Sequence, residues 1–397
     1  MSEWKKVKLK DCCIKIGSGS TPKGGSMVYV NSGTSLIRSQ NVYNLSFDYN
    51  GLTHITEDAA NKLKGVTVFN EDILLNITGD SVARTCIVPK EVLPARVNQH
   101  VAIIRTDRKK MNWRFLNYYL ASPKMQAHML SLAVGKGASR NALTKQMIEN
   151  FEVPYPPLST QHRIANILSR YDSLIENYQK QIKLLEEAAQ RLYKEWFIDL
   201  RFPGHENTNI IDGVPEGWEK KKLIDLVDVQ YGYAFDGHLF NSKEEGTPIV
   251  RIRNIPDGYT NDYTTEEASE SYIINDGDIL VGMDGIFHIN TWSGGKAFLV
   301  QRACSFRPKD DSMKGFILQA IYEPIKFFEN TVVGATVAHL GKKHIDSIEL
   351  LVSKNVSLYK PFEKMFNERQ TLKSQLRLLT EARDRLLPKL MSGEITV

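Results

Sequence analysis

The sequence predicts an α+β protein in which two similar β-rich globules are separated by two long helices that pack as an intramolecular antiparallel coiled coil. Two observations predict this fold. The chain resembles itself at a shift of about 200 residues, and each copy passes into a stretch with apolar residues at alternating steps of three and four. With 397 residues the chain has room for more than one core. We expect globule, helix, globule and helix at residues 1–153, 154–202, 203–350 and 351–397.

The internal repeat consists of short matches that follow one another in the same order in both halves. Residues 37–42 (IRSQNV) match 250–255 (VRIRNI), and Asp72-Ile73-Leu74 match Asp278-Ile279-Leu280. Further along, Gln99-His100 match Gln301-Arg302, and Gly137-Ala138-Ser139 match Gly334-Ala335-Thr336. Each match is weak alone. Their common order and steadily falling shift indicate a duplication whose second copy has shorter loops.

Within the globules, short runs bounded by turn residues predict strands. These runs are residues 66–69, 72–77, 101–105, 249–252, 278–281 and 297–300. Single helices are predicted at 112–120 and 315–328. Strands therefore outnumber helices in each globule, which makes the fold class α+β.

The two helical stretches carry matching seams of apolar residues. The first seam is Ile164, Leu168, Tyr171, Ile175, Tyr178, Ile182, Leu185, Ala189, Leu192 and Trp196. The second is Leu358, Phe362, Met365, Leu372, Leu376, Leu379, Leu386 and Leu390, with Arg369 and Arg383 at the two remaining positions. Ser159 and Thr160 are expected N-caps of the first helix. In the second, Pro361 suits the first turn and Pro388 should bend or end the helix.

A single seam of this kind would also suit a homodimer, but two matched seams in one chain favour packing onto each other. Antiparallel packing brings the tail of the chain back beside its head and gives approximate twofold symmetry. At the rise of an α-helix, the first seam is about 48 Å long, which would make the helix pair a rigid spacer between the globules.

Composition excludes several classes of protein. Mean hydropathy is −0.31, and no run approaches the roughly 18 apolar residues of a membrane helix, so we expect a cytoplasmic protein with no membrane contact. Cys12, Cys13, Cys86 and Cys304 have neither a disulfide nor a zinc spacing, so we expect reduced structural thiols. The net charge of +5 is too small to prove a polyanionic partner by itself.

Motifs for catalysis are missing from the sequence. No glycine-rich cofactor loop follows a strand, and Pro154-Tyr155-Pro156-Pro157 lacks the leading Asn or Asp of a DNA amino-methyltransferase motif. The Gly-Lys pairs at 295–296 and 341–342 lack the other residues of a phosphate-binding loop, and the nine His residues have no metal-ligand spacing. We therefore expect a non-catalytic chain that holds neither a metal nor a cofactor.

Basic and amide side chains instead gather in glycine-bearing loops at equivalent places in both copies. Guanidinium and amide groups suit base edges in DNA, whereas Lys, Ser and backbone N–H groups suit phosphates. The candidate DNA-binding residues of the first copy are Thr21, Lys23, Arg38, Gln40, Asn41, Thr78, Arg84, Lys136, Ser139, Arg140 and Asn141. Those of the second copy are Arg251, Arg253, Asn254, His288, Trp292, Gln301, Arg302, Thr336, His339, Lys342 and Lys343.

One stretch of the second copy has the opposite charge. Between Asn254 and Gly285 there are eight acidic residues and no Lys or Arg. We expect this stretch to face away from phosphates. A basic partner subunit or plain solvent could then lie against it.

Three segments make the chain resemble the specificity subunit of a type I restriction-modification system. They are Pro156-Pro157-Leu158 with Gln161, Ile164-Ala165, Ile167-Leu168 and Asp172; Leu192-Tyr193-Lys194-Glu195-Trp196-Phe197 with Arg201-Phe202-Pro203; and the tail Leu386-Leu387-Pro388-Lys389-Leu390-Met391-Ser392-Gly393-Glu394-Ile395. Residues 352–362 of the second copy lack the Pro-Pro and Gln of the first, which leaves the start of the second helix open.

The resemblance implies two target-recognition domains that read the two halves of a split asymmetric site in double-stranded DNA. It also implies two modification (methyltransferase) subunits that carry S-adenosylmethionine and dock on the helical spacers, with restriction (motor-nuclease) subunits joining them. The alternatives are a coiled-coil scaffold without DNA readout and an enzyme with an unrecognised site.

Overall fold

A computed structural model describes residues 4–134, 141–331 and 338–397 of the chain. The chain divides into two compact units. Unit 1 comprises Met1–Leu174 and Leu379–Val397, and unit 2 comprises Ile175–Leu378. In unit 1 the tail packs beside the head, since a Cβ on Gly393 would lie 3.3 Å from the ring of Trp4. This confirms the predicted return of the tail.

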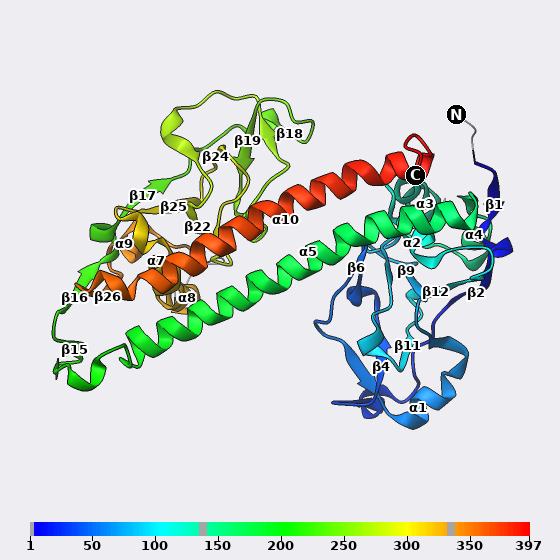
Figure 1. The fold of residues 1–397 in the computed structure, drawn as a ribbon, viewed down its shortest axis with the longest axis horizontal. Helices are drawn as coiled ribbons and strands as arrows, with labels where there is room; N and C mark the ends of the chain where they lie inside the picture. Colours follow the sequence, from blue (N-terminus) through cyan, green and yellow to red (C-terminus); the bar gives the residue numbers. More distant parts are fainter. Residues whose placement is uncertain (1–3, 135–140, 332–337) are drawn as a thin grey trace. The chain divides into compact units, whose positions relative to one another are not determined.

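Unit 1 contains two main sheets (Figure 1). The antiparallel four-stranded sheet has the order β10 (Thr85–Ile87), β9 (Ile73–Asn76), β12 (Val101–Thr106) and β2 (Cys13–Ser18). The five-stranded sheet has the order β3 (Tyr29–Val30), β7 (Thr53–Ile55), β4 (Thr34–Ile37), β11 (Ala95–Val97) and β8 (Thr67–Val68). Only β4 and β11 of this sheet run parallel. Two further strand pairs are β1 (Lys6–Lys8) with β13 (Glu152–Pro154), and β5 (Val42–Tyr43) with β6 (Ser46–Phe47).

Unit 2 repeats the topology of both main sheets, and among its described residues only the β5–β6 pair has no counterpart. Its four-stranded sheet has the order β23 (Ile289–Thr291), β22 (Ile279–Gly282), β25 (Ala303–Pro308) and β17 (Val227–Tyr231). Its five-stranded sheet has the order β18 (Phe240–Asn241), β20 (Tyr263–Thr264), β19 (Thr247–Val250), β24 (Ala297–Leu299) and β21 (Ile273–Ile274), with β19 and β24 parallel. The pair β16 (Trp218–Lys222) and β26 (Glu349–Ser353) matches β1 and β13, and β14 (Ile210–Ile211) with β15 (Val214–Pro215) is an addition. The predicted duplication is confirmed.

Short helices pack on these sheets. Unit 1 has α1 (Glu57–Lys62), α2 (Trp113–Ala121), α3 (Pro123–Ala133) and α4 (Lys145–Glu149), and unit 2 has α6 (Leu223–Leu226), α7 (Lys314–Ala320), α8 (Tyr322–Thr331) and α9 (Lys342–Asp346). Asn112 caps α2 by accepting a hydrogen bond from the Phe115 N–H, as the predicted helix at 112–120 requires. The single helix predicted at 315–328 is wrong, because the chain turns at Ile321 between α7 and α8.

The strand predictions are correct in type, but several extend one or two residues too far. The strand predicted at 249–252 ends at Val250, because a 3₁₀ turn occupies Ile252–Asn254. Strands β1 to β7, which precede residue 66, were not predicted. Most are two to four residues long and carry little alternation.

Equivalent ion pairs brace the same corner of each unit. In unit 1 Arg105 binds Asp72 at 2.7 Å, and in unit 2 Arg307 binds Asp278 at 2.7 Å. Each carboxylate also accepts a backbone N–H three residues upstream, from Phe69 in the first case. The match Asp72-Ile73-Leu74 with Asp278-Ile279-Leu280 therefore reflects one structural element used twice.

The two long helices are α5 (Leu158–Tyr193) and α10 (Lys360–Ser392). Ser159 and Thr160 are not N-caps, because α5 already begins at Leu158 and the Pro157 carbonyl accepts a hydrogen bond from the Thr160 N–H at 2.9 Å. Leu358 lies before α10, in the 3₁₀ turn Val356–Leu358, although it is buried as expected. Pro361 lies in the first turn of α10, and the helix continues past Pro388 rather than ending there.

In unit 1 the first part of α5 packs antiparallel against the last part of α10 (Figure 1). Ile164 and Leu168 share a core with Leu390. One turn further along α5, Asp172 binds the guanidinium of Arg383 at 3.0 Å and accepts a hydrogen bond from the Tyr118 hydroxyl. The residue numbers rise along one helix as they fall along the other, so the direction is antiparallel.

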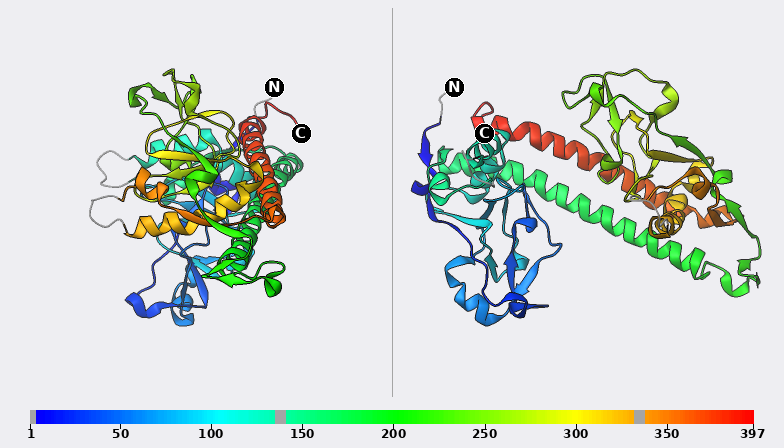
Figure 2. Two further views of the ribbon diagram at one scale, coloured as in Figure 1. Left: turned by 90° about the vertical axis from the view of Figure 1, so that its left-hand side faces the viewer. Right: turned by 180° about the vertical axis from the view of Figure 1, so that it is seen from behind.

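Unit 2 contains the same packing at the other ends of the helices (Figure 2). Glu186 of α5 binds Arg369 of α10 at 2.6 Å, and the ring centroids of Trp196 and Phe362 lie 6.1 Å apart. Every residue of the two predicted seams is buried or half-buried. The predicted antiparallel zipper is therefore confirmed in each unit, while the twofold relation and the spacing between the globules stay predictions.

Two other sequence expectations concern membranes and thiols. Among the described helices, none is apolar over a length that could cross a bilayer. The thiols of Cys12, Cys86 and Cys304 are buried and free, and Cys13 is free and half-buried.

A glycine at the same place in both units permits a close backbone approach. A Cβ on Gly19 would lie 2.0 Å from the Val97 carbonyl oxygen, and a Cβ on Gly232 would lie 2.1 Å from that of Val300. We expect Gly19→Ala and Gly232→Ala each to lower the free energy of unfolding by about 1–3 kcal/mol or more, because the backbone must shift. Urea unfolding of the full chain measures this.

Gly17→Ala is the matched control, since nothing lies within 4 Å of its Cβ position on β2. Equal midpoints for Gly17→Ala and Gly19→Ala would contradict the close approach.

Candidate nucleic-acid interface

The first candidate element is a polar turn that follows β4 in unit 1, at residues 38–41. The Arg38 N–H donates a hydrogen bond to Asn41 Oδ1 at 3.0 Å, which closes the 3₁₀ turn Ser39–Asn41. Asn41 Nδ2 donates to the carbonyl oxygens of Asp48 and Asn50 at 2.9 and 3.2 Å. Asn41 is fully buried, so its prediction as a DNA-binding residue is corrected: its side chain shapes the turn from inside.

The side chains of Arg38 and Gln40 lie together over Gly51. Arg38 Nη2 donates to the Gly51 carbonyl oxygen at 2.7 Å, and Gln40 Nε2 reaches the same oxygen at 3.3 Å. A Cβ at position 51 would lie 2.4 Å from Gln40 Nε2, and the φ of Gly51 is +66°. Arg38 Nε is buried without a hydrogen-bond partner among the described residues. This turn therefore presents a guanidinium group that binds no carboxylate among the described residues.

Unit 2 has the same turn at residues 251–254, with different chemistry at its surface. The Arg251 N–H donates to Asn254 Oδ1 at 2.9 Å, as in unit 1, and Arg251 Nε is likewise buried without a partner among the described residues. Here the guanidinium groups of Arg251 and Arg253 bind the carboxylate of Asp262 at 2.7 and 2.9 Å. Asn254 Nδ2 donates to the same carboxylate at 3.1 Å.

Asp262 occupies the position that Thr53 holds in unit 1. Thr53 pairs with Leu36 on β4. At the equivalent place on β19, the backbone carbonyl oxygen of Asp262 accepts a hydrogen bond from the Ile249 N–H. Burial alone would raise the pKa of Asp262. The hydrogen bonds from the Arg251 turn outweigh burial, so the pKa of this carboxyl lies below its ordinary value.

A second polar cluster lies in the loops that follow β9 and β22, and it shows the same difference in charge between the two units. In unit 1 Thr78 Oγ1 lies 2.5 Å from His100 Nδ1, and Thr78 forms a β-bridge with Ala142. In unit 2 Asp284 forms the equivalent bridge with His339, and it binds Arg302 at 3.0 Å and His339 at 2.5 Å. An aspartate of unit 2 again stands where unit 1 has a threonine.

The acidic stretch of unit 2 therefore does not all face away from the candidate cations. Asp262 and Asp284 both belong to it and both bind cations that were predicted to contact DNA. Their carboxylates neutralise neighbouring cations of the candidate interface, and the expectation that the stretch faces away from phosphates stays a prediction.

The remaining candidates are placed as follows. Arg84 stacks on Tyr43 with its guanidinium carbon 4.6 Å from the ring centroid, and the Thr21 hydroxyl donates to Gln99. Five side chains are exposed and His288 is half-buried; the exposed ones are Lys23, Asn141, Gln301, Lys342 and Lys343. Lys136, Ser139, Arg140 and Thr336 lie outside the described residues.

Trp292 is a further correction. Its ring is fully buried in the core with Val250 and Leu280, and its Nε1 donates to the Gly295 carbonyl oxygen at 2.5 Å. An indole in this position packs the sheet and is not available to a base.

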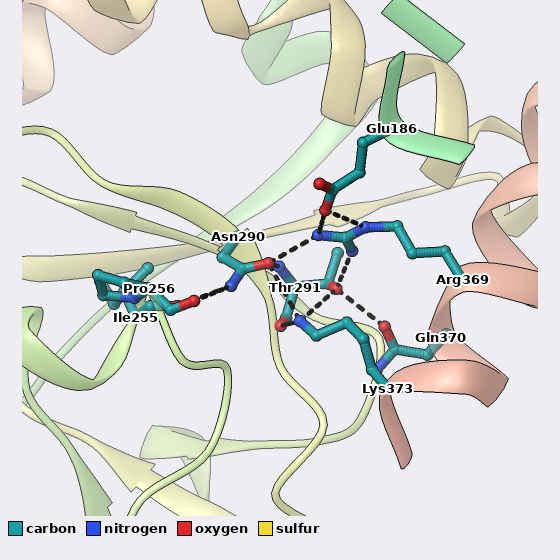
Figure 3. A network of polar contacts seen from close by, with 8 residues as sticks. All are labelled: Glu186, Ile255, Pro256, Asn290, Thr291, Arg369, Gln370 and Lys373. Carbon is teal, nitrogen blue, oxygen red and sulfur yellow. Dashed lines mark hydrogen bonds and ion pairs between the residues drawn. The ribbon is translucent and has the colours of Figure 1, made fainter. Parts of the chain in front are cut away.

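The two turns are supported from beneath by different asparagines. In unit 1 Asn76 on β9 donates from Nδ2 to the Ser39 carbonyl oxygen at 2.8 Å. At the equivalent position of β22, unit 2 has Gly282. Its turn is instead supported by Asn290 on β23, which donates to the carbonyl oxygens of Ile255 and Pro256 at 3.0 and 2.7 Å (Figure 3).

Asn290 is itself bound by α10. Arg369 Nη2 and Lys373 Nζ donate to Asn290 Oδ1 at 2.8 and 3.0 Å, and Lys373 Nζ also donates to the Thr291 carbonyl oxygen at 2.5 Å. Lys373 is almost completely buried, and burial together with the neighbouring Arg369 lowers its pKa well below the ordinary value. Figure 3 shows these side chains converging on β23 from one face of the helix.

The roles of Asn76, Asp262, Asp284 and Asn290 have no direct signal in the sequence, because they depend on which strands are neighbours. Arg369 was the one visible clue, as a charged residue in an apolar seam. Among the described residues, no group of three or more His, Cys, Asp or Glu is placed to hold a metal ion.

Comparisons with known proteins agree with the duplicated architecture. The family described as "Type I restriction modification DNA specificity domain" matches residues 1–187 and 215–353. The "Type I restriction enzyme MjaIX specificity subunit" of Methanocaldococcus jannaschii is 27% identical over 419 residues, covering 100% of this chain and 94% of the relative. The "Type I restriction enzyme HindI specificity subunit" of Haemophilus influenzae is 19% identical and covers 100% of both chains.

A solved structure has a similar fold. The crystal structure of a type-I restriction-modification system S subunit from M. genitalium matches with a TM-score of 0.60 at 16% identity, covering 98% of this chain and 96% of that one. The two family matches fall on the two copies of the repeat. The chain belongs to the family of type I restriction-modification DNA specificity domains.

Proposed function

We propose that this chain is the DNA-sequence-recognition subunit of a type I restriction-modification complex, with unit 1 reading one half of a split site and unit 2 the other. The observation that carries this proposal is the repeated polar turn. In both units the turn follows an equivalent strand and is closed by an equivalent asparagine. The surface of the unit 1 turn presents Arg38 and Gln40, whereas that of the unit 2 turn presents Arg251, Arg253 and Asp262. One scaffold with two different surfaces suits an asymmetric site.

The side chains of the two turns have the chemistry of base readout. A guanidinium fork can donate two hydrogen bonds to O6 and N7 of guanine, and an amide can bind adenine in the same way. A carboxylate such as Asp262 can accept from the exocyclic amine of cytosine. The guanidinium of Arg38, which binds the Gly51 carbonyl oxygen but no carboxylate among the described residues, also suits a phosphate, and experiment separates base contact from phosphate contact.

The complex we propose has further parts. Two modification subunits would dock on the α5–α10 helix pair and bring S-adenosylmethionine, and restriction subunits would join them for cleavage. This chain would determine which DNA sequence the complex binds and would catalyse no reaction itself. It would work in the cytoplasm. The name "specificity subunit" carried by its relatives supports this division of labour.

The test is to express the chain with its modification subunits in a host that lacks this modification, and to sequence the methylated positions of the host genome. We expect a split, non-palindromic motif. A palindromic or unsplit motif would contradict the proposal. A scaffold without DNA readout would show neither methylation nor salt-dependent gel shifts with the assembled complex.

Arg38→Ala should relax recognition in one half of the motif only. Loss of a bidentate base contact costs about 1–3 kcal/mol of discrimination. Motif sequencing with the variant complex measures this, and Arg108→Ala is the control, because Arg108 is an exposed arginine of the same unit bound to Glu71. Equal weakening on every DNA would identify Arg38 as a phosphate contact.

Asp262→Thr, which installs the residue of unit 1, should change recognition in the other half of the motif. The variant frees the guanidinium groups of Arg251 and Arg253 and removes a negative charge from the turn. We expect tighter non-specific binding to DNA, with a plot of log binding constant against log salt concentration that is steeper by about one released counterion. We also expect a changed base preference in that half of the motif. Titrations at several salt concentrations and motif sequencing measure the two effects.

The control is Glu267→Thr, which removes the same charge from an exposed position of the same stretch. If both variants changed the motif alike, the effect would come from net charge and not from the turn.

A further inference from the structure

The Arg251 turn of unit 2 is continuous with a loop that lies directly against α10. Ile255, the residue after the turn, is fully buried. Three residues later, Gly258 has a φ of +72°, and a Cβ there would lie 2.6 Å from Lys373 Nζ. Ser293 holds the same loop, because its N–H and its hydroxyl both donate to the Gly258 carbonyl oxygen, at 2.8 and 2.9 Å. The helix and the loop thus meet without room for a side chain between them.

Asn290 joins the helix to the loop through the two ends of one amide group. Its Oδ1 accepts hydrogen bonds from Arg369 and Lys373 of α10, and its Nδ2 donates to the carbonyl oxygens of Ile255 and Pro256 (Figure 3). Because an amide is planar, fixing Oδ1 also fixes the direction of both Nδ2 hydrogen bonds. The position of the loop therefore depends on the position of the helix.

The helix side of this contact is rigidly held. Arg369 also binds Glu186 of α5 at 2.6 Å and donates to Thr291 Oγ1 at 2.6 Å. Gln370 accepts from the Thr291 hydroxyl at 2.8 Å, and Arg377 donates to the Ser293 carbonyl oxygen at 3.1 Å. Residues 369, 370, 373 and 377 form one face of α10, so the whole face is bound to the strand β23 and the loop after it.

Among its described residues, unit 1 has no counterpart of this link through Asn290. The position of Asn290, opposite Leu280 in the sheet, corresponds to Cys86, which lies opposite Leu74. Cys86 is buried and carries no amide. The unit 1 turn is supported by Asn76, which belongs to the same four-stranded sheet and donates to Ser39 and Val42. Within the described part of the chain, only the turn of unit 2 is thus bound to a long helix in this way.

We propose that Asn290 is a positioning residue for sequence recognition, which sets the Arg251 turn against helix α10 and so determines which bases unit 2 accepts. This inference rests on the proposed function, since it assigns to Asn290 the placement of a turn that reads DNA. Asn290 itself touches no base. It acts through Ile255 and Pro256, which directly follow Asn254.

Asn290→Asp separates positioning from support of the fold. The new carboxylate keeps an oxygen for Arg369 and Lys373 and can bind both cations as ion pairs. Its second oxygen replaces the Nδ2 donor and faces the carbonyl oxygens of Ile255 and Pro256, at 3.0 and 2.7 Å from the present nitrogen. Acceptors that face each other repel, so the loop moves while the attachment of β23 to the helix remains.

The experiment compares the wild type, Asn290→Asp and Asn290→Ala as full chains assembled with the modification subunits, using host genomic DNA as the substrate. Each complex is checked by thermal unfolding and by its subunit composition before motif sequencing. The control is Asn261→Asp, which adds the same charge at an exposed position beside Asp262.

We expect Asn290→Asp to assemble and unfold like the wild type, and to lose about tenfold discrimination at the bases of one half-site only. That half should be the one altered by Asp262→Thr. Asn290→Ala should relax the same half and lower the unfolding temperature, whereas Asn261→Asp should leave the motif unchanged.

Two results would overturn the inference. One is a wild-type motif from an Asn290→Asp complex that assembles normally, and the other is a uniform loss of methylation with a lowered unfolding temperature, which would make Asn290 a support of the fold alone. If the wild-type complex itself gave no split motif, the proposed function would fail first, so the two failures are distinguishable.

Discussion

The antiparallel packing of α5 against α10 is the constraint on which the rest of the structure depends. Each seam is apolar except at Arg369 and Arg383 of α10, and each of these arginines binds an acidic residue of α5, Glu186 or Asp172. A charged residue inside an apolar seam is stable only where its partner faces it, so such pairs select register and direction. The guanidinium of Arg369 is buried, whereas the carboxylate side chain of Glu186 is 46% exposed, so this pair contributes less to stability than a fully buried pair would.

The duplicated scaffold shows how one fold can carry two surfaces. The strand order, the Asp72–Arg105 type of brace and the asparagine-capped turn are the same in both units. The differences gather at the candidate interface, where unit 2 has Asp262 and Asp284 in place of Thr53 and Thr78. Asp262 binds the guanidinium of Arg251, whose unit 1 counterpart Arg38 binds no carboxylate among the described residues, and Asp284 binds Arg302 where unit 1 has His100. Chemistry at the interface can therefore vary without any change to the core.

Much of the fold could be predicted from the sequence because the signals that define it are local or repeated. The seams of α5 and α10 have one period over many residues, and the repeat needs only a comparison of the chain with itself. Two- and three-residue strands such as β3 and β7 carry no period to detect. Pro388 did not end α10, because packing of Leu387 and Leu390 into the unit 1 core holds the last turn.

The candidate site was harder to predict, since residue type does not show which way a side chain points. Asn41 and Trp292 have groups that could bind DNA, but one closes a turn and the other fills a core. Asp262 lies in a stretch whose charge suggested distance from DNA, yet strand pairing brings it to the Arg251 turn. Only the pairing of β19 with β20 decides this, and that pairing is not local.

The two turns are held by different parts of the structure, so they differ in how far their positions depend on the long helices. The unit 1 turn takes its support from Asn76 on β9, a strand of the four-stranded sheet of the same globule, so turn and anchor stay together if that globule is altered. The unit 2 turn takes its support from Asn290, whose geometry is fixed by Arg369 and Lys373 on α10. Because the same face of α10 carries the seam contact to Glu186, a shift of the helix pair acts on this turn through two hydrogen bonds. Recognition by unit 2 is thereby coupled to the packing on which the fold rests, whereas no such link reaches the turn of unit 1 among its described residues.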